Sequence, residues 1–261
     1  MEFWPAVAIL AAGAVAGAVN AAVGSGTLIT FPTLLALGYP PVIANISNNV
    51  GLVPGSVAGA WGYRGEVRAL ARVVVPLLFC SATGGALGAV ALLTLPSSAF
   101  DAIVPVLIVL SIVLVVAQPY LARRVAARPG SSAAEAAGTT VRPLGVGLML
   151  GVLIAGVYGG YFGAAQGVLL IGLLGWLLTS SLQHANGVKN VLSAVVNGVA
   201  ALVFVIAAPG QLDFAVAGLI AVGSTVGGVV GAALSRRLPA PLLRGFIVIV
   251  GCAAVVKLLV T

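Results

Sequence analysis

Residues 81–89 read SATGGALGA, and residues 224–232, which lie 143 positions later, read STVGGVVGA. A serine, a glycine pair and a Gly-Ala dipeptide recur in the same order in both stretches. Slightly smaller offsets connect further residues of the two halves of the chain. These pairs are Gly17 with Gly156, Gly24 with Gly163, Asn45 with Asn186 and Asn49 with Asn190. Such an ordered set of matches predicts an internal duplication.

The composition around these repeats is typical of a membrane protein. Of the 261 residues, 61% are hydrophobic and only 7% are charged, and the mean hydropathy is +1.22. Soluble domains average about 25% charged residues, so a soluble globular protein is excluded. Several apolar runs are shorter than the roughly 20 residues that a membrane span needs. We therefore expect an all-α polytopic membrane protein in which the short helices are broken or re-entrant, with about 8–10 helical segments.

The expected helical runs divide the chain into three parts. The runs cover residues 3–19, 28–37, 41–62, 73–93, 100–117, 143–156, 168–178, 182–207, 214–234 and 242–260. We interpret residues 1–122 as the first transmembrane repeat and residues 143–261 as the second. Residues 123–142 contain Arg123, Arg124 and the sequence PGSS, which indicates a basic hydrophilic linker.

Basic residues cluster in three of the segments between the runs. These are segments 63–72, 123–142 and 235–244, whereas segments 94–98 and 208–212 contain no Lys or Arg. The positive-inside rule predicts that the three basic segments are cytoplasmic, in a multi-pass protein of the inner (plasma) membrane. Equivalent segments of the two halves then face opposite sides, which is typical of the inverted-topology repeats of secondary transporters.

The same distribution of charge restricts the partners that we expect. The formal net charge of +7 is a signal of topology, so nucleic acid is excluded as a partner. The expected partners are the lipid bilayer and a small anionic substrate, and a homodimer stays open.

Each half carries a Gly-rich break after its first run. Gly24 and Gly26 lie in the first break, and Gly160 and Gly163 lie in the second. A break within the membrane leaves backbone N–H groups unpaired, and a helix that begins there carries about +0.5 of a charge at its N-terminus. Two such ends that face each other are predicted to form an anion site near the midplane.

Lys189 is the leading candidate for a substrate-binding residue. It lies well within an apolar run and away from the basic clusters. A charge at the centre of the bilayer costs about 2.5–3.5 kcal/mol, so it needs a compensating role, and pairing with an anionic substrate is the simplest one. The alternative is that Lys189 lies closer to an interface and snorkels.

Neutral polar residues near the breaks extend this candidate site. Asn45 and Asn49 are four residues apart, as are Asn186 and Asn190, so each pair shares one face of a helix. Amide groups of this kind donate hydrogen bonds to oxyanions. The further candidates for substrate binding are Ser25, Asn45, Asn48, Asn49, Gln166, Asn186 and Asn190. In the alternative interpretation these side chains cap helices, bridge helices or bind local backbone.

His184 is the sole histidine and precedes the second Asn/Lys motif. It is a candidate for proton coupling, and the alternative is a cap or an interfacial group at the start of a helix. The chain has no paired carboxylates, no Ser/His/Asp set and no nucleotide-binding motif. Cys80 and Cys252 form no CxxC motif. We therefore expect no enzymatic activity, no cofactor and no metal site.

At these residues the sequence resembles the sulfite exporter TauE/SafE family of permeases. The likeness covers essentially the whole chain. It is carried by 24–27 with Phe31-Pro32, 44–49, 159–163, 185–190 and Asn197. The chain departs from the family pattern in having a single Gly pair in the first break and Asn at position 45, where Gly is frequent. It also has Pro209 in place of a longer loop. The first of these departures leaves the shape of the first half-helix end open.

The resemblance implies a permease for a small sulfur-containing or organosulfur anion such as sulfite or a sulfonate, coupled to the proton gradient. Together with the duplication, it leads us to expect a secondary transporter whose halves rock to give alternating access to the site. Two alternatives stay open. One is a passive small-anion channel, and the other is a non-transporting membrane subunit that binds a partner protein.

Overall fold

A computed structural model describes residues 2–126, 143–179 and 181–234, with residues 245, 247–250 and 252 beyond them. The described part is built from helices and contains no strand. In chain order the helices are α1 (Phe3–Ala22), α2 (Thr27–Ala36), α3 (Pro41–Gly62), α4 (Arg64–Ala69), α5 (Ala71–Thr94), α6 (Ser97–Ala126), α8 (Val146–Tyr161), α9 (Gln166–Leu177), α10 (Leu182–Ala207) and α11 (Phe214–Leu234), with a 3-10 helix at Pro209–Gln211. Five helices, α1, α5, α6, α10 and α11, are long and apolar enough to cross a membrane. The expected all-α membrane protein is confirmed.

Local sequence signals explain several helix boundaries. The predicted runs 41–62, 182–207 and 214–234 are α3, α10 and α11 with the same bounds. Helix α3 begins with a proline in its first turn, where a missing N–H costs nothing. Helix α10 begins after Ser181, whose hydroxyl accepts a hydrogen bond from the His184 backbone N–H at 3.4 Å.

Other boundaries differ from the prediction. Helix α8 continues through Gly156 to Tyr161, so Gly160 lies inside a helix and is not a break residue. Packing explains the glycine at this position, because a Cβ on Gly160 would collide with the Gly85 carbonyl on α5. The basic segment 63–72 contains the short helix α4. Helix α6 extends to Ala126, and the rest of the expected linker, like most of the run 242–260, lies outside the described residues.

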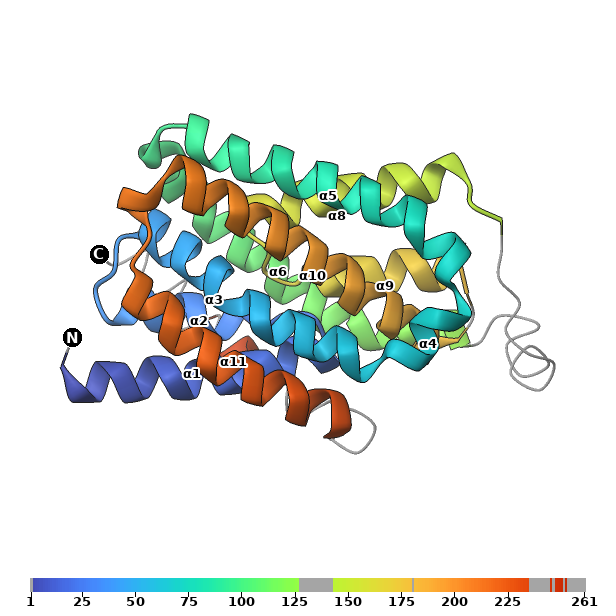
Figure 1. Cartoon of the computed structure of the whole chain (residues 1–261), viewed down its shortest axis with the longest axis horizontal. Coiled ribbons are helices and arrows are strands. Elements are labelled where there is room, and N and C mark those ends of the chain that lie inside the picture. Colours follow the sequence, from blue (N-terminus) through green and yellow to red (C-terminus); the bar gives the residue numbers. More distant parts are fainter. Residues whose placement is uncertain are drawn as a thin grey trace.

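Two helix hairpins enter the bundle from opposite ends (Figure 1). Helices α1 and α2 form one hairpin, and its open end lies beside the N-terminus on the left of the picture. Helices α8 and α9 form the other, with its open end on the right beside α4. Each hairpin turns inside the bundle at one of the Gly-rich breaks. The two hairpins therefore have opposite orientations in the bundle, as inverted-topology repeats predict.

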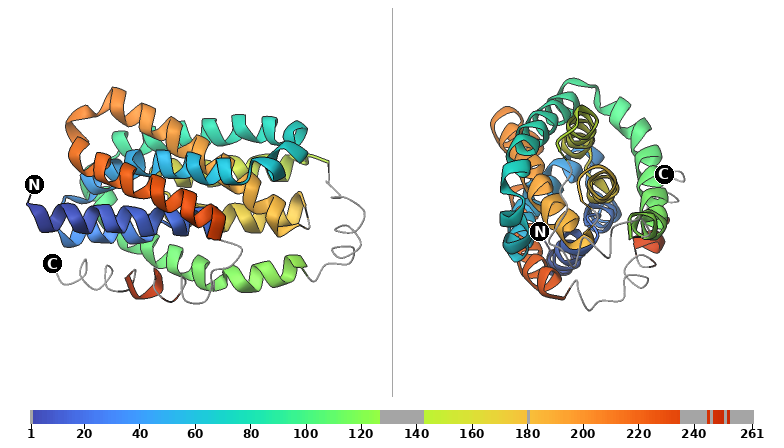
Figure 2. Two further views of the ribbon diagram at one scale, coloured as in Figure 1. Left: turned by 60° about the horizontal axis from the view of Figure 1, so that its bottom comes forward. Right: turned by 90° about the vertical axis from the view of Figure 1, so that its right-hand side faces the viewer.

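The two halves are interlaced (Figure 2). Helix α5 of the first half packs on α8 and α10 of the second, and α11 of the second half packs on α1 and α3 of the first. The duplication is visible in single contacts. Gly17 lies against Ser224, and its repeat counterpart Gly156 lies against Ser81. Close approach of backbones at small residues explains these contacts, so the recurring small-xxx-small pattern reflects helix packing.

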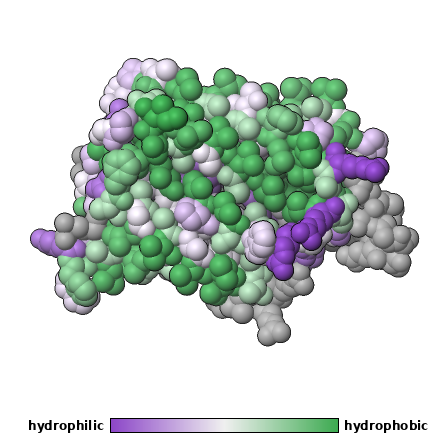
Figure 3. All heavy atoms as spheres, in the orientation of Figure 1, coloured by the Kyte–Doolittle hydropathy of each residue, from purple (hydrophilic) through white to green (hydrophobic). Residues whose placement is uncertain are grey.

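The surface of the bundle separates apolar and polar residues (Figure 3). Hydrophobic residues cover the middle of the face shown, and hydrophilic residues gather towards its two ends. Arg64 and Arg68 of α4 are exposed at the end that we call the basic end, where Arg64 stacks over Trp61 at 5.4 Å. An apolar belt of this kind fits a protein that faces lipid around its circumference.

Candidate functional site

The two Gly-rich breaks meet inside the bundle. In the first break Gly24 has a φ of +85°, and in the second Gly163 has a φ of +79°. Only glycine adopts this left-handed backbone readily, which explains its presence where each hairpin turns. The Gly167 N–H donates a hydrogen bond to the Gly24 carbonyl at 3.1 Å, and a Cβ on Gly163 would lie 4.0 Å from the Thr27 hydroxyl. The backbone of one break is therefore in contact with that of the other.

Four helix ends converge at this contact. Helices α1 and α8 end at the breaks, and α2 and α9 begin there. The ends of α1 and α8 present carbonyl groups and partial negative charge, whereas the starts of α2 and α9 present N–H groups and partial positive charge. Two helix starts in one compact region offer a small anion a set of backbone donors.

Lys189 and Asn190 cap the end of α1. Lys189 is fully buried, and its Nζ donates hydrogen bonds to the carbonyl oxygens of Asn20 at 2.9 Å and Ala21 at 3.2 Å. The Asn190 amide donates to the same Ala21 carbonyl at 3.1 Å. Lys189 therefore does not snorkel to an interface. Its predicted contact with a substrate stays a prediction, because the ammonium is bound to backbone.

Asn45 caps the end of α8 in the corresponding way. Its Nδ2 donates a hydrogen bond to the Tyr161 carbonyl at 2.9 Å, so α3 of the first half reaches the broken helix of the second. The other asparagines make separate contacts. Asn48 bonds Thr27 at 3.3 Å and also Thr30, and Asn186 donates to the Tyr63 hydroxyl at 2.7 Å. Each asparagine named here thus bridges two helices or a helix and a loop.

Several buried polar atoms near the breaks have no hydrogen-bond partner among the described residues. Five of them belong to candidate ligands: Asn45 Oδ1, Asn186 Oδ1 and the three considered next, Ser25 Oγ, Gln166 Nε2 and Asn49 Oδ1. Ser25 lies two residues before the first residue of α2, and Gln166 is the first residue of α9. All three side chains are at most 6% exposed. Because a buried polar group without a partner is costly, these atoms indicate a place where a polar ligand completes the hydrogen bonding.

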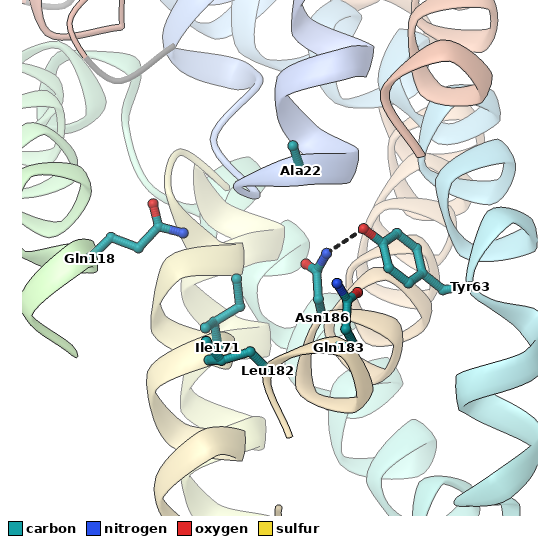
Figure 4. A pocket seen from close by; sticks show the side chains of 7 residues that line it. All are labelled: Ala22, Tyr63, Gln118, Ile171, Leu182, Gln183 and Asn186. Atoms are coloured by element: carbon teal, nitrogen blue, oxygen red, sulfur yellow. Dashed lines mark hydrogen bonds between the residues drawn. The ribbon is translucent and has the colours of Figure 1, made fainter. Parts of the chain in front are cut away.

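A pocket of about 160 Å³ opens near the basic end (Figure 4). It extends to Ala22, at the end of α1, and holds several water volumes. Its polar side chains come from the end of α3, from α6 and from the first turns of α10: Tyr63, Gln118, Gln183 and Asn186. Of these, only Asn186 was predicted. Gln118 and Gln183 are polar residues at the edges of apolar runs, which is a weak signal. Tyr63 follows an apolar run, where the sequence indicates an interfacial aromatic anchor and not a pocket residue.

Aromatic side chains fill the opposite side of the breaks. Phe31 packs edge-on against Phe162 at 5.2 Å between ring centroids, and Phe100 packs against Phe162 at 6.3 Å and Tyr161 at 5.7 Å. The three phenylalanines are at most 2% exposed. We call Phe31, Phe100, Tyr161 and Phe162 the aromatic cluster. Close packing of these rings buries Phe162, the residue that follows α8 at the second break.

His184 lies in the first turn of α10. Its Nδ1 is 2.9 Å from the Ser181 hydroxyl, whose oxygen also accepts from the His184 backbone N–H. This contact matches a group at a helix start, and a role in proton transfer stays a prediction. Among the described residues no three His, Cys, Asp or Glu side chains are grouped so that they could hold a metal ion.

Comparison with known proteins identifies one family. A family profile described as "Sulfite exporter TauE/SafE" matches residues 9–258, which is nearly the whole chain. No curated protein matches the chain. No solved structure matches it either.

Proposed function

We propose a specific transport function on the premise that this chain belongs to the sulfite exporter TauE/SafE family. Membership makes it a multi-pass membrane transporter of sulfite or related sulfur anions. The proposal adds a mechanism, a site and a sidedness. The protein moves a small sulfur oxyanion or sulfonate across the cytoplasmic membrane by alternating access, with its basic end in the cytoplasm.

The anion binds where the two breaks meet. The observation that carries this proposal is the pair of buried, unpartnered donor atoms, Ser25 Oγ and Gln166 Nε2, beside the starts of α2 and α9. A serine hydroxyl, amide N–H groups and backbone N–H groups all donate to sulfur-bound oxygens without a formal charge. The ammonium of Lys189 supplies the positive charge of this region, since its chain runs beside Gly167 at the start of α9.

The remaining asparagines contribute to the site through the framework. Asn45 and Asn190 hold the ends of the broken helices, and Asn48 holds the start of α2 through its bonds to Thr27 and Thr30. Asn186 faces the pocket near the basic end and meets the anion on its way to the breaks. In this proposal Asn45, Asn48 and Asn190 position the helix ends, and Asn186 alone contacts the anion on its path.

Two features support alternating access. The pocket near the basic end reaches the first break, whereas the aromatic cluster covers the breaks on the other side. This arrangement corresponds to a state that is open to the cytoplasm. The moving bodies cannot be the two halves of the sequence, because their separation would break the contacts of α5 with α8 and of α11 with α1. Mixed bodies that keep these pairs together are the units that rock.

Coupling to protons completes the proposal. His184 is the candidate for proton coupling, since it is the sole histidine of the chain and lies in the first turn of α10, the helix that also contributes Gln183 and Asn186 to the pocket. The other route is a proton carried by the substrate itself.

The test is saturable uptake of labelled sulfite into proteoliposomes, with a sulfonate and sulfate as competitors. Replacing Ser25 by Ala removes a hydroxyl from the site, and Ser98→Ala removes an exposed hydroxyl from the start of α6 as the matched control. We expect Ser25→Ala to raise the concentration for half-maximal uptake about tenfold, as the loss of one hydrogen bond to a charged group does. Equal uptake by both variants would contradict the site, and absent uptake by the wild type would contradict the substrate.

A further inference from the structure

The buried ammonium of Lys189 is bound in a way that a substrate ligand does not require. Both oxygens that accept its hydrogen bonds, those of Asn20 and Ala21, are carbonyls in the last turn of α1. The next N–H groups along the chain, of Val23 and Gly24, bond instead to the Val19 carbonyl. The two carbonyls are therefore free for an outside donor, as at any helix end.

The end of α1 is a place that attracts a cation. A helix C-terminus carries about −0.5 of a charge, and this one lies in an apolar interior where the field is weakly screened. The four described acidic residues lie elsewhere: Glu2, Glu66, Asp101 and Asp213 are outside the fully buried interior. Broken transmembrane helices commonly coordinate Na⁺ with carbonyl groups of this kind. Here the ammonium of Lys189 lies where such an ion would bind.

The lysine is also held in place along its length. A Cβ on Gly167 would lie 2.8 Å from Lys189 Cδ, so the side chain passes directly over the first turn of α9. Gly167 is the residue whose N–H binds the Gly24 carbonyl. The side chain thus connects α10, the start of α9 and the end of α1, and it fixes the geometry with which the two breaks meet.

At the second break no ammonium is bound to the helix end among the described residues. This end, at Tyr161, receives the neutral amide of Asn45. At the offset of 141 that pairs the asparagines, the repeat counterpart of Lys189 is Asn48, which bonds Thr27 and Thr30 and no helix end. The charge is therefore specific to the end of α1, and it is not a shared requirement of the duplicated framework.

We propose that the Lys189 ammonium is a tethered replacement for an exchangeable alkali cation at the broken end of α1. It occupies the place of a free ion at the carbonyl groups, so that transport requires neither Na⁺ nor K⁺. Lys189 is a positioning residue: it acts on the anion through the geometry and the potential of the breaks. The transport part of this inference rests on the proposed function, whereas the cation site itself does not.

The test compares the wild type with Lys189→Ala in buffers that contain choline, Na⁺ or methylammonium as the main cation. The first readout is thermal unfolding in detergent without sulfite. We expect the wild type to unfold at the same temperature in all three buffers. We expect the variant to be destabilised in choline and to regain stability in Na⁺ or methylammonium, because the truncated side chain leaves two buried carbonyl groups that a free cation can reach.

The second readout is uptake of labelled sulfite in the same buffers. Wild-type uptake is expected to be independent of the cation, and uptake by Lys189→Ala is expected to fall about tenfold in choline and to recover several-fold in methylammonium. Arg68→Gln, which removes an exposed positive charge from α4, controls for net charge and is expected to behave as the wild type. Recovery by a free cation distinguishes a positioning role from a merely structural one.

Three results would overturn the inference. The first is wild-type uptake or stability that differs between Na⁺ and choline, which needs no variant and so holds even if Lys189→Ala does not fold. The second is a Lys189→Ala variant with unchanged stability in choline. The third is a variant that no cation restores and that has lost stabilisation by sulfite, which would make the ammonium a direct ligand. If the wild type transports no sulfite, the proposed function fails, and the unfolding experiment still decides about the cation site.

Discussion

The two breaks share a backbone design and differ in nearly every side chain around it. Both turn at a glycine with positive φ, Gly24 in one and Gly163 in the other. The first break follows Ala22, is capped by a buried ammonium and adjoins an open pocket. The second follows Tyr161 and is covered by the aromatic cluster. The two halves thus share the half-helix ends, whereas the first break has a buried ammonium and the second has the aromatic cluster.

The second break is also held by two hydroxyl groups, one from α6 and one from α8. The Ala164 carbonyl accepts hydrogen bonds from Tyr158 at 2.6 Å and from Ser111 at 3.1 Å. The first break receives its support from α10, through Lys189 and Asn190. The breaks are thus stabilised by different helices, so a movement that opens one side need not disturb the other.

The largest effect is expected from a substitution that forces the two breaks apart. Gly24→Ala adds strain at a positive φ and brings a Cβ into the backbone of Gly167, whereas Gly38→Ala adds the same strain at φ +89° with nothing within 4 Å. The strain alone costs about 1–2 kcal/mol. We expect Gly38→Ala to lose that stability in thermal unfolding and Gly24→Ala to lose more and to abolish sulfite uptake. Equal losses would show that the breaks do not need their close contact.

A second experiment removes one ring of the aromatic cluster. Phe162→Ala takes an aromatic ring from the contacts with Phe31 and Phe100, and Phe79→Ala, on the exposed face of α5, serves as the control. In a background without native cysteines, we expect Phe162→Ala to raise the reaction of Ser25→Cys with an impermeant maleimide, added from the end opposite α4, about tenfold. An unchanged rate would show that the aromatic cluster is no barrier.

The caps of the broken helices offer a smaller and more direct comparison. Asn45→Ala leaves the Tyr161 carbonyl without its described side-chain donor, whereas Asn190→Ala leaves the Ala21 carbonyl with Lys189. A buried carbonyl without a partner costs about 1–3 kcal/mol. Thermal unfolding is therefore expected to show a loss in this range for Asn45→Ala and a smaller one for Asn190→Ala. The reverse order would contradict the cap assigned to Lys189.

The smallest effect is expected outside the spans, at the end opposite α4. Burial first, and then the nearby charge of Asp213, raise the pKa of Tyr39 above its ordinary value. Asp213→Asn removes the charge, so the pKa of Tyr39 is expected to fall towards that value, as ultraviolet titration would detect. Tyr39 stays neutral at pH 6–8 in both forms, and sulfite uptake is therefore expected to respond equally to pH. A pH response that differed between the two forms would implicate this end in coupling.

The sequence predicted the helical framework well, for physical reasons. Apolar runs, prolines and caps define α3, α10 and α11, and glycines at equal offsets identify Gly24 and Gly163 as turns. It could not predict the partners of Lys189, because backbone carbonyls leave no trace in the order of side chains. The end of α8 was predicted too early, since a glycine in a membrane helix reads equally as a break or as a packing surface.

The residues of the pocket were mostly missed for another reason. Tyr63, Gln118 and Gln183 come from three separate helical regions, and only the fold brings them together with Asn186. The aromatic cluster is a similar case, because Phe31 and Phe162 belong to different halves. Contacts between interlaced halves depend on tertiary packing, which a duplicated sequence implies in outline but does not specify by residue.

Counterflow of sulfite tests the central claim most directly. Proteoliposomes that contain the wild type are loaded with unlabelled sulfite or with buffer alone, and the entry of labelled sulfite is followed. A single anion site at the breaks, open to one side at a time, predicts saturable entry that unlabelled sulfite inside accelerates. Entry that rises in proportion to concentration, with no acceleration, would contradict alternating access and indicate a channel.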